Sequence, residues 1–334
     1  MEKDLRVGVI GLGRLGYQHA ANIRKAIGAE LVGIADPSEK TLKRAQNDFK
    51  VSAFSDYRDM LKEVELDAVV VATPTQTHFE ILKELIEIGL PIFCEKPITY
   101  TLEEAKIILD MVQERNHFIQ IGYMRRFDPG HTKAKELIVS GEIGDPLYLH
   151  DCQRDPNGPP PEYVPMSGGL FVDMAIHDLD VARWLMGSEI VEIYAQGAVL
   201  KHEYLKELND VDDGQILLKF ANGNLGMIEI SRNACNVYDV RTEVVCKKSS
   251  IFVGQNQLTP YTLVGDEKIT VDMSNWVLDR FKDAYELEIQ AFVDSVRNGE
   301  ASKVNAFDGY IGLKLALAAT ESHLTGQKVL IENE

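Results

Sequence analysis

The sequence has few cysteines and no long apolar run. Its four cysteines, Cys94, Cys152, Cys235 and Cys246, are scattered along 334 residues, and no two form a CxxC pair. This spacing excludes a zinc knuckle and a disulfide framework and is typical of a reducing compartment. The longest apolar stretches, such as AVVVA at 68–72, are too short to span a bilayer. The N-terminal segment MEKDLRVGVIGLG shows no signal peptide. We therefore expect a cytoplasmic protein with no membrane partner.

Positive charge is also scarce. The chain has 35 Lys and Arg against 52 Asp and Glu, a formal net charge of −17, and no run of basic residues offsets it locally. This balance argues against nucleic acid or an anionic membrane surface as a partner. The hydrophobic share of 45% and the charged share of 26% are ordinary for a globular protein, and 334 residues suffice for two domains.

The first third of the chain alternates short apolar runs with helical patterns. The runs are nearly continuous in hydrophobicity, as strands of a parallel sheet covered on both faces are. They lie at 5–10, 31–35, 67–72, 91–94 and 118–122, and the helical patterns at 14–27, 39–49, 76–88 and 102–115. Alternation of this kind predicts an α/β fold with a doubly wound parallel sheet, the Rossmann type.

The pattern changes after residue 123. A helix at 130–140 precedes an extended stretch, PLYLHDCQRD, and a proline-rich loop, DPNGPPPEYVP. Residues 190–272 read mainly as strands and turns, with the hairpin signal Asn222-Gly223 between two alternating runs. Helices at 280–298 and 306–325 and a strand near KVLI complete the chain. We predict a Rossmann domain at 1–123 and, at 124–334, an α+β domain with a large, mainly antiparallel open sheet for substrate binding and oligomerisation.

A glycine-rich loop, GLGRLG at 11–16, joins the first strand to the first helix. In that context the glycines allow a tight turn and a close approach to a pyrophosphate at the helix N-terminus. The predicted cofactor-binding residues here are Gly11, Leu12, Gly13, Arg14, Leu15 and Gly16, together with Asp36 and Pro37 at the end of the second strand. A carboxylate at 36 accepts hydrogen bonds from ribose hydroxyls and repels a 2′-phosphate, which favours NAD over NADP.

Polar residues also follow two later strands, in ATPTQTH at 72–78 and CEKP at 94–97. Ligands of doubly wound sheets bind outside the carboxyl ends of the strands. We therefore expect further cofactor contacts from Thr73, Pro74, Thr75, His78, Glu95 and Lys96. A lysine at a strand end is by default a solvated surface charge, but the place of Lys96 between a buried strand and Pro97 favours a fixed position.

The stretch GGLFVDMAIHDLDVARWL at 168–185 places an acid and a histidine within the apolar stripe of a helix. Asp173 and His177 are four residues apart and share a face. Three interpretations are open. The two can form a satisfied core pair, they can contribute to a metal site, or the acid can orient a histidine for acid/base chemistry. One Asp and one His leave a typical metal site short of ligands, so we expect no metal ion.

GLGRLG, ATPTQTH, CEKP and DMAIHDLDVARWL together resemble the glucose-fructose oxidoreductase/inositol dehydrogenase/rhizopine catabolism family. The resemblance covers the whole chain, and RDPNGPPPEY and SRNACNVYDVRTEVV are similar to its inositol 2-dehydrogenase branch. It implies a catalytic trio of Lys96, Asp173 and His177. His177 is then the base in the cleft between the domains, Asp173 orients it or accepts a substrate hydroxyl, and Lys96 hydrogen-bonds the reacting oxygen. Tyr285 resembles a family position near the nicotinamide.

A cyclic polyol needs hydrogen-bonding groups around its ring. The candidates are Arg125, Arg126, Arg154, Asp155 and Asn157, each with a surface ion-pairing role as the alternative. The chain departs from the usual RxAxYGYD of the branch, because Asn236 and Val237 stand where Tyr and Gly are expected. Asn236 is therefore a further candidate, and it puts the preferred stereoisomer in question. Gln153-Arg154-Asp155 also differs from the His-Arg-Asn of some members.

These features predict an NAD-dependent inositol 2-dehydrogenase that oxidises a ring hydroxyl of myo-inositol or scyllo-inositol to the keto-inositol. One alternative is another cyclic-polyol or aldose dehydrogenase of the family, including one for phosphorylated sugars, since Arg125 and Arg126 can pair with a phosphate. The other is a non-catalytic, cofactor-sensing regulator on the same fold. The second face of the C-terminal sheet, with strands such as QILLKF and LGMIEI, is expected to pack on a partner subunit, and the family resemblance implies a homotetramer.

Overall fold

The chain folds into two compact units, each described here by itself. The computed structural model describes residues 3–235, 237–254, 263–265, 268–270 and 272–332. Unit 1 comprises residues 1–124 and 283–311, and unit 2 comprises 125–282 and 312–334. The predicted boundary assigns residues 283–311 to the second domain. In the structure these residues pack with the first unit.

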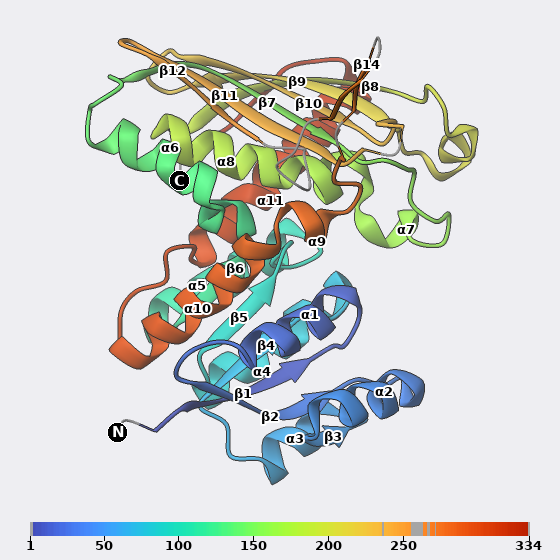
Figure 1. Ribbon diagram of the computed structural model, residues 1–334, viewed down its shortest axis with the longest axis vertical. Helices are drawn as coiled ribbons and strands as arrows, with labels where there is room; N and C mark the ends of the chain where they lie inside the picture. The colour runs from blue at the N-terminus through green and yellow to red at the C-terminus, as the bar shows by residue number, and fades with distance from the viewer. Residues whose placement is uncertain (1–2, 236, 255–262, 266–267, 271, 333–334) are drawn as a thin grey trace. The chain divides into compact units, whose positions relative to one another are not determined.

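Unit 1 is built on a six-stranded sheet with the order β3-β2-β1-β4-β5-β6, and all its neighbouring strands run parallel (Figure 1). The strands are β1 (Leu5–Ile10), β2 (Ala29–Ala35), β3 (Ser52–Phe54), β4 (Ala68–Val71), β5 (Ile92–Glu95) and β6 (Ile119–Gly122). This confirms the predicted doubly wound sheet. Strand β3 is not predicted from the sequence, because three residues that stay exposed or half-buried are too few to give a hydrophobic run.

In the part of unit 1 that the structure describes, five helices connect these strands and a sixth comes later in the chain, and local chemistry sets where these helices end. They are α1 (Arg14–Ile23), α2 (Glu39–Phe49), α3 (Tyr57–Glu63), α4 (His78–Ile88), α5 (Leu102–Arg115) and α10 (Lys282–Asn298), with a 3-10 turn η1 (Thr75–Thr77) before α4. Thr101 and Glu104 form a capping box at the start of α5. Ile289 and Phe292 of α10 join Val9 and Phe93 in the buried core, which is why residues 283–311 belong to this unit.

Unit 2 holds a seven-stranded sheet with the order β12-β11-β7-β10-β9-β8-β15. The strands are β7 (Pro146–Arg154), β8 (Ile190–Ala198), β9 (Asp213–Phe220), β10 (Leu225–Ser231), β11 (Asp239–Cys246), β12 (Ser250–Val253) and β15 (Val329–Leu330). Within the part of the sheet that the structure describes, β7 and β10 run parallel and the other neighbours antiparallel, which confirms the predicted mainly antiparallel sheet. The expected hairpin joins β9 to β10 at Gly223 (φ +87°). A separate pair, β13 (Leu263–Gly265) and β14 (Lys268–Thr270), is antiparallel.

Helices α6 and α8 lie along one face of this sheet (Figure 1). The helical elements are η2 (Met124–Phe127), α6 (Pro129–Val139), α7 (Val164–Ser167), the π-helical turn η3 (Phe171–Ala175), α8 (Ile176–Met186), η4 (Glu203–Leu208), α9 (Val277–Arg280) and α11 (Ala306–Thr325). Residues in β9 alternate between buried and exposed, as a sheet covered on one face requires. Its opposite face exposes Tyr194, Leu217 and Leu225.

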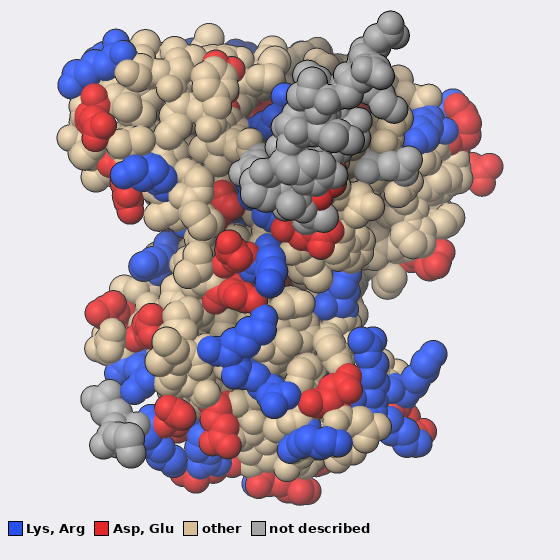
Figure 2. Space-filling view, in the orientation of Figure 1, with Lys and Arg blue, Asp and Glu red and all other residues tan. Residues whose placement is uncertain are grey.

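Lys and Arg are interspersed with Asp and Glu on the face of unit 1 that Figure 2 shows, unlike the continuous basic stripe typical of a nucleic-acid site. Among the described residues, no helix has both the length and the apolar content that crossing a membrane takes.

Candidate functional site

The glycine-rich loop is shaped by close backbone packing. Gly11 has a φ of +86° and its N–H donates to the Ala35 carbonyl at 2.8 Å. A Cβ on Gly16 would lie 1.9 Å from the Gly11 carbonyl oxygen, so only glycine fits there. A Cβ on Gly13, directly before α1, would meet nothing within 4 Å. The first turn of α1 contains no acidic residue. The loop therefore leaves open space at the N-terminus of α1, where the helix dipole and the backbone N–H groups favour an anion. A pyrophosphate fits there.

Asp36 lies half-buried beside this loop at the end of β2. Its Oδ2 accepts a hydrogen bond from the Leu12 backbone N–H at 2.7 Å, and its Oδ1 accepts one from the Ser38 N–H at 2.8 Å. Each carboxylate oxygen keeps a further lone pair for a ribose hydroxyl. Asp36 therefore fixes the loop and offers the acceptors that an NAD ribose requires, with Pro37 exposed next to it.

His78 joins the ends of β4 and β5. It is buried, and its two ring nitrogens lie 3.0 Å from the Thr73 carbonyl and 2.9 Å from the Pro97 carbonyl. Burial lowers the pKa of His78, and its carbonyl contacts oppose that shift. Because a neutral imidazole donates from one nitrogen only, His78 hydrogen-bonds one of the two carbonyls and packs against the other, between the loops that carry Thr73 and Lys96. Pro74 and Thr75 lie on the first of these loops, at the start of η1.

Glu95 ends β5 and has 6% of its surface exposed. Its Oε1 lies 2.6 Å from Nε2 of His19, a residue of α1. A Cβ on Gly122 of β6 would lie 3.1 Å from the Glu95 carboxylate, so this glycine leaves it room. Lys96 follows directly and is half-buried. Tyr285 of α10 contacts the His19 ring edge-on, with 6.0 Å between centroids. Unit 1 thus contains every predicted cofactor-binding residue.

Asp173 lies in the π-helical turn that precedes α8. Its Oδ1 accepts a hydrogen bond from the Tyr163 hydroxyl at 3.0 Å, and its Oδ2 accepts one from the Arg232 guanidinium at 3.0 Å. Arg232 also donates to Asp210 at 3.0 Å, and its side chain is only 2% exposed. A buried arginine between two carboxylates fixes the orientation of both. His177, on the next turn, is 7% exposed.

The sequence analysis did not predict Arg232, Asp210 or Tyr163 as parts of this site. Arg232 follows β10 directly, within the segment SRNACNVYD whose later positions drew attention. A basic residue at the end of a strand that alternates buried and exposed positions was the available signal. Its partner Asp210 is 22 residues away in sequence, and only the fold brings the two together.

Arg125 and Arg126 make buried ion pairs. Arg125 is 1% exposed, donates to Asp178 at 2.6 Å and also to Gln153, and lies 3.6 Å from Asp151. Burial opposes its charge, but the carboxylates of Asp178 and Asp151 outweigh that and raise the pKa of Arg125. These contacts favour the structural alternative for Arg125 over contact with substrate.

The carboxyl group of Asp178, next to His177 in sequence, titrates unusually. Burial and the nearby Asp151 raise the pKa of Asp178 to about 8, against the opposing effect of Arg125. Arg126 makes two hydrogen bonds to the Asp180 carboxylate, at 2.9 and 2.5 Å. Helix α8 therefore anchors both arginines of the RR pair, through Asp178 and Asp180.

The remaining substrate candidates lie around the end of β7. Arg154 donates to Glu229 at 2.7 Å and to Asp239 at 2.9 Å. The backbone N–H of Asp155 donates to the Ser231 carbonyl at 2.8 Å. Asn157 is exposed in the loop that follows. Asn236 lies outside the described residues, so its contribution stays a prediction.

Comparison with known proteins identifies relatives along the whole chain. A family model described as "Oxidoreductase family, NAD-binding Rossmann fold" matches residues 5–123, and one described as "Oxidoreductase family, C-terminal alpha/beta domain" matches residues 135–331. The chain is 37% identical to scyllo-inositol 2-dehydrogenase (NAD(+)) of Bacillus subtilis, over 99% of this chain and 98% of the relative. It is 35% identical to myo-inositol 2-dehydrogenase of Thermotoga maritima, over 98% and 99%.

One of the similar solved structures contains bound ligands. The crystal structure of scyllo-inositol dehydrogenase from Lactobacillus casei, with bound cofactor NAD(H) and scyllo-inositol, superposes with a TM-score of 0.93. It is 31% identical and covers 98% of this chain and 99% of that one.

Proposed function

Because the chain belongs to the glucose-fructose oxidoreductase/inositol dehydrogenase/rhizopine catabolism family that its motifs resemble, we propose that it is an NAD-dependent inositol 2-dehydrogenase. It oxidises a ring hydroxyl of myo-inositol or scyllo-inositol to the keto-inositol. The observation that carries the proposal is the likeness to inositol dehydrogenases along nearly the full length of both chains.

Bound NAD supplies the hydride acceptor, while the residues of the chain bind, orient and move a proton. We propose His177 as the base that takes the hydroxyl proton, and Asp173 as the group that orients His177 or accepts a neighbouring hydroxyl. Lys96 donates a hydrogen bond to the reacting oxygen as negative charge develops on it. Support for Asp173 comes from Arg232 and Tyr163, which fix both of its carboxylate oxygens.

We propose that the cofactor is bound by the residues of GLGRLG, by Asp36 and Pro37, by Thr73, Pro74, Thr75 and His78, and by Glu95, Lys96 and Tyr285. The open space at Gly13 and the free lone pairs of Asp36 support this set. The substrate candidates are Arg126, Arg154, Asp155, Asn157 and Asn236, with Arg125 in a supporting position because its guanidinium is occupied.

We further propose a homotetramer in the cytoplasm. The exposed apolar side chains Tyr194, Leu217 and Leu225 lie on one face of the seven-stranded sheet, and burying such a face is a common reason for subunit association. The four cysteines are unpaired, as in a reducing compartment.

The test is a rate assay of NAD and NADP reduction with myo-inositol, scyllo-inositol, D-chiro-inositol, glucose and xylose. We expect turnover of an inositol with NAD. His177→Ala and Lys96→Met should each lower kcat at least about 10²-fold while NAD still binds, since positioned acid/base groups contribute about 10²–10⁴-fold. Turnover of aldoses alone would replace inositol by a sugar as substrate. NAD binding without any turnover would contradict the enzyme function itself.

A further inference from the structure

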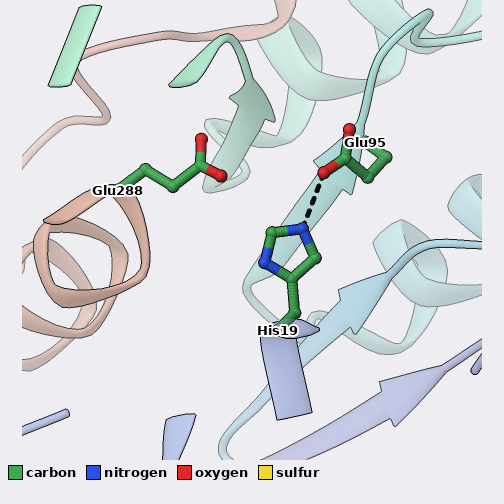
Figure 3. A group of neighbouring side chains, drawn as sticks. All are labelled: His19, Glu95 and Glu288. Atoms are coloured by element: carbon green, nitrogen blue, oxygen red, sulfur yellow. Dashed lines mark hydrogen bonds and ion pairs between the residues drawn. The ribbon is translucent and has the colours of Figure 1, made fainter. Parts of the chain in front are cut away.

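Three buried side chains converge in unit 1 from elements that are distant in sequence (Figure 3). They are His19 of α1, Glu95 of β5 and Glu288 of α10. His19 and Glu288 have no exposed surface, and Glu95 has 6%. One ligand atom of each lies within 4.8 Å of those of the other two. A histidine and two carboxylates thus share one water-excluded space. One of the three, Glu95, directly precedes Lys96 in the chain.

Glu288 is the unusual member of this cluster. Neither of its carboxylate oxygens has a hydrogen-bond partner among the described residues, although its backbone carbonyl accepts a hydrogen bond from Gln120 of β6 at 2.9 Å. Burial, and then the charge of Glu95, raise the pKa of Glu288 well above its usual range. A buried, unpaired carboxylate is strongly unfavourable unless it binds a proton or a cation.

The geometry favours a proton over a metal ion. Nε2 of His19 and Oε1 of Glu95 lie 2.6 Å apart, which is a hydrogen-bond distance. Two ligands each about 2.0–2.2 Å from one ion lie roughly 3 Å or more apart at tetrahedral or octahedral angles. The His19–Glu95 pair is therefore held by a hydrogen bond rather than by an ion, and Glu288 faces the Glu95 carboxyl group.

We propose that Glu288 is a neutral carboxylic acid in the working protein and that it is a positioning residue, whose proton lets Glu95 hold the end of β5 and so fixes Lys96. The part concerning Lys96 rests on the function proposed above. The described titratable groups that face Glu288 are His19 from α1 and Glu95 from β5, while β6 presents the neutral Gln120. On α10 itself, the neighbouring Tyr285 contacts His19.

Loss of the Glu288 proton would place two negative carboxylates in one dry space. Glu95 would have to move, and the adjacent Lys96 with it. The sign of the linkage follows, because Glu288 has a higher pKa in the folded chain than in the unfolded one. A glutamate has a pKa of about 4.3 in the unfolded chain, and above that pH the folding equilibrium constant falls about tenfold per pH unit. The fall ends at the pH at which Glu288 ionises in the folded protein.

The first measurement is denaturant unfolding of the full-length protein between about pH 5 and 9, the range in which this linkage acts. Glu288→Gln keeps the shape and carries no charge. We expect it to be more stable than the parent at alkaline pH and to lose part of the decline of stability with pH. The matched control is Glu286→Gln on the same helix, where the carboxylate is 34% exposed and pairs with Lys25 at 2.6 Å. It should keep that decline.

Two further readouts separate positioning from a merely structural role. The infrared spectrum of the parent should contain the carbonyl stretch of a protonated carboxylic acid, and E288Q should lack it. The alkaline limb of kcat/KM should move to higher pH in E288Q and stay in place in E286Q.

A variant E288Q that is less stable than the parent at every pH would overturn the proposal. A stoichiometric divalent metal ion in the purified protein, absent from E288Q, would replace it by a metal site. Failure to oxidise any inositol would contradict the proposed function alone, because the unfolding and infrared measurements need no turnover.

Discussion

At the scale of single residues, Arg232 is the residue whose contacts matter most for the proposed chemistry of unit 2. Its guanidinium joins Asp173 to Asp210, and Asp210 in turn accepts a hydrogen bond from the Leu170 backbone N–H at 2.8 Å. One buried arginine therefore fixes both the carboxylate beside His177 and the backbone at the start of the π-helical turn. A planar, five-donor group is suited to such a double contact, and a lysine is not.

We predict that Arg232→Lys lowers kcat for inositol oxidation by at least about tenfold and the free energy of unfolding by about 3 kcal/mol. The point charge of lysine cannot reach both carboxylates, so one is left buried without its partner. Steady-state kinetics and urea unfolding measure the two effects. Arg183→Lys is the control, because Arg183 pairs with Glu189, whose side chain is 44% exposed, and the substitution should change either value little. Equal kinetics for R232K and the parent would contradict the role of Arg232.

In the sequence, such contacts are visible only as polar residues inside the apolar stripe of a helix. Asp173 and His177 were predicted from this signal. Glu288 carries the same signal, since it lies among Tyr285, Ile289 and Phe292 on the buried side of α10. It was missed because its partners, His19 and Glu95, are 269 and 193 residues away in sequence, and no local pattern connects them.

At the scale of elements, the junction of β1, the glycine-rich loop and α1 depends on contacts between backbones. Gly16 packs against the Gly11 carbonyl, whereas Gly13 faces open space. The two glycines of one motif therefore serve different purposes, one in folding and one in binding.

We predict opposite behaviour for Gly16→Ala and Gly13→Ala. A Cβ 1.9 Å from a carbonyl oxygen forces the loop apart, so G16A should lose at least about 3 kcal/mol of stability. G13A should keep its stability within about 0.5 kcal/mol, as substitutions away from contacts do, but bind NAD more weakly. Thermal unfolding and NAD titration by fluorescence distinguish them. An unchanged NAD affinity in G13A would contradict the placement of the cofactor at this helix.

Long, strongly periodic elements were predicted well from the sequence. Strands β1, β2, β4, β5 and β6, the β9–β10 hairpin and helices α5 and α8 agree with the expected segments. Short elements were not, because β3 has three residues and α3 seven, too few to show a period. The predicted helix at 280–298 is divided at Phe281, whose side chain is fully buried and whose backbone leaves the helical region. Tertiary packing, which the sequence does not display, decides such a break.

At the scale of the whole molecule, the exposed face of the seven-stranded sheet presents neighbouring apolar residues. Tyr194 pairs with Leu217 in the β8–β9 register, and Leu217 pairs with Met227 in the β9–β10 register. Leu217 is 54% exposed at the centre of this row. The predicted covering of this face by a partner subunit follows from the alternation of the strands, but the number of subunits does not.

We predict that Leu217→Glu shifts the protein from the proposed tetramer to smaller species, since burying an unpaired carboxylate in an interface costs several kcal/mol. Analytical ultracentrifugation measures the species present. Val139→Glu, at a 73% exposed position on α6, on the helix-covered face of the sheet, is the control and should leave the assembly intact. Identical sedimentation of L217E and the parent would exclude this face as the interface.

The return of residues 283–311 to unit 1 has a consequence for how the protein is made. The chain passes from one unit to the other at residues 124, 282 and 311. A ribosome that has released the first 124 residues has therefore not yet made Ile289, Phe292 and Val293, which complete the core around β1 and β4. Unit 2 likewise waits for β15, which begins at Val329. Unit 1 therefore completes its core only after residues 125–282 of unit 2 have been made.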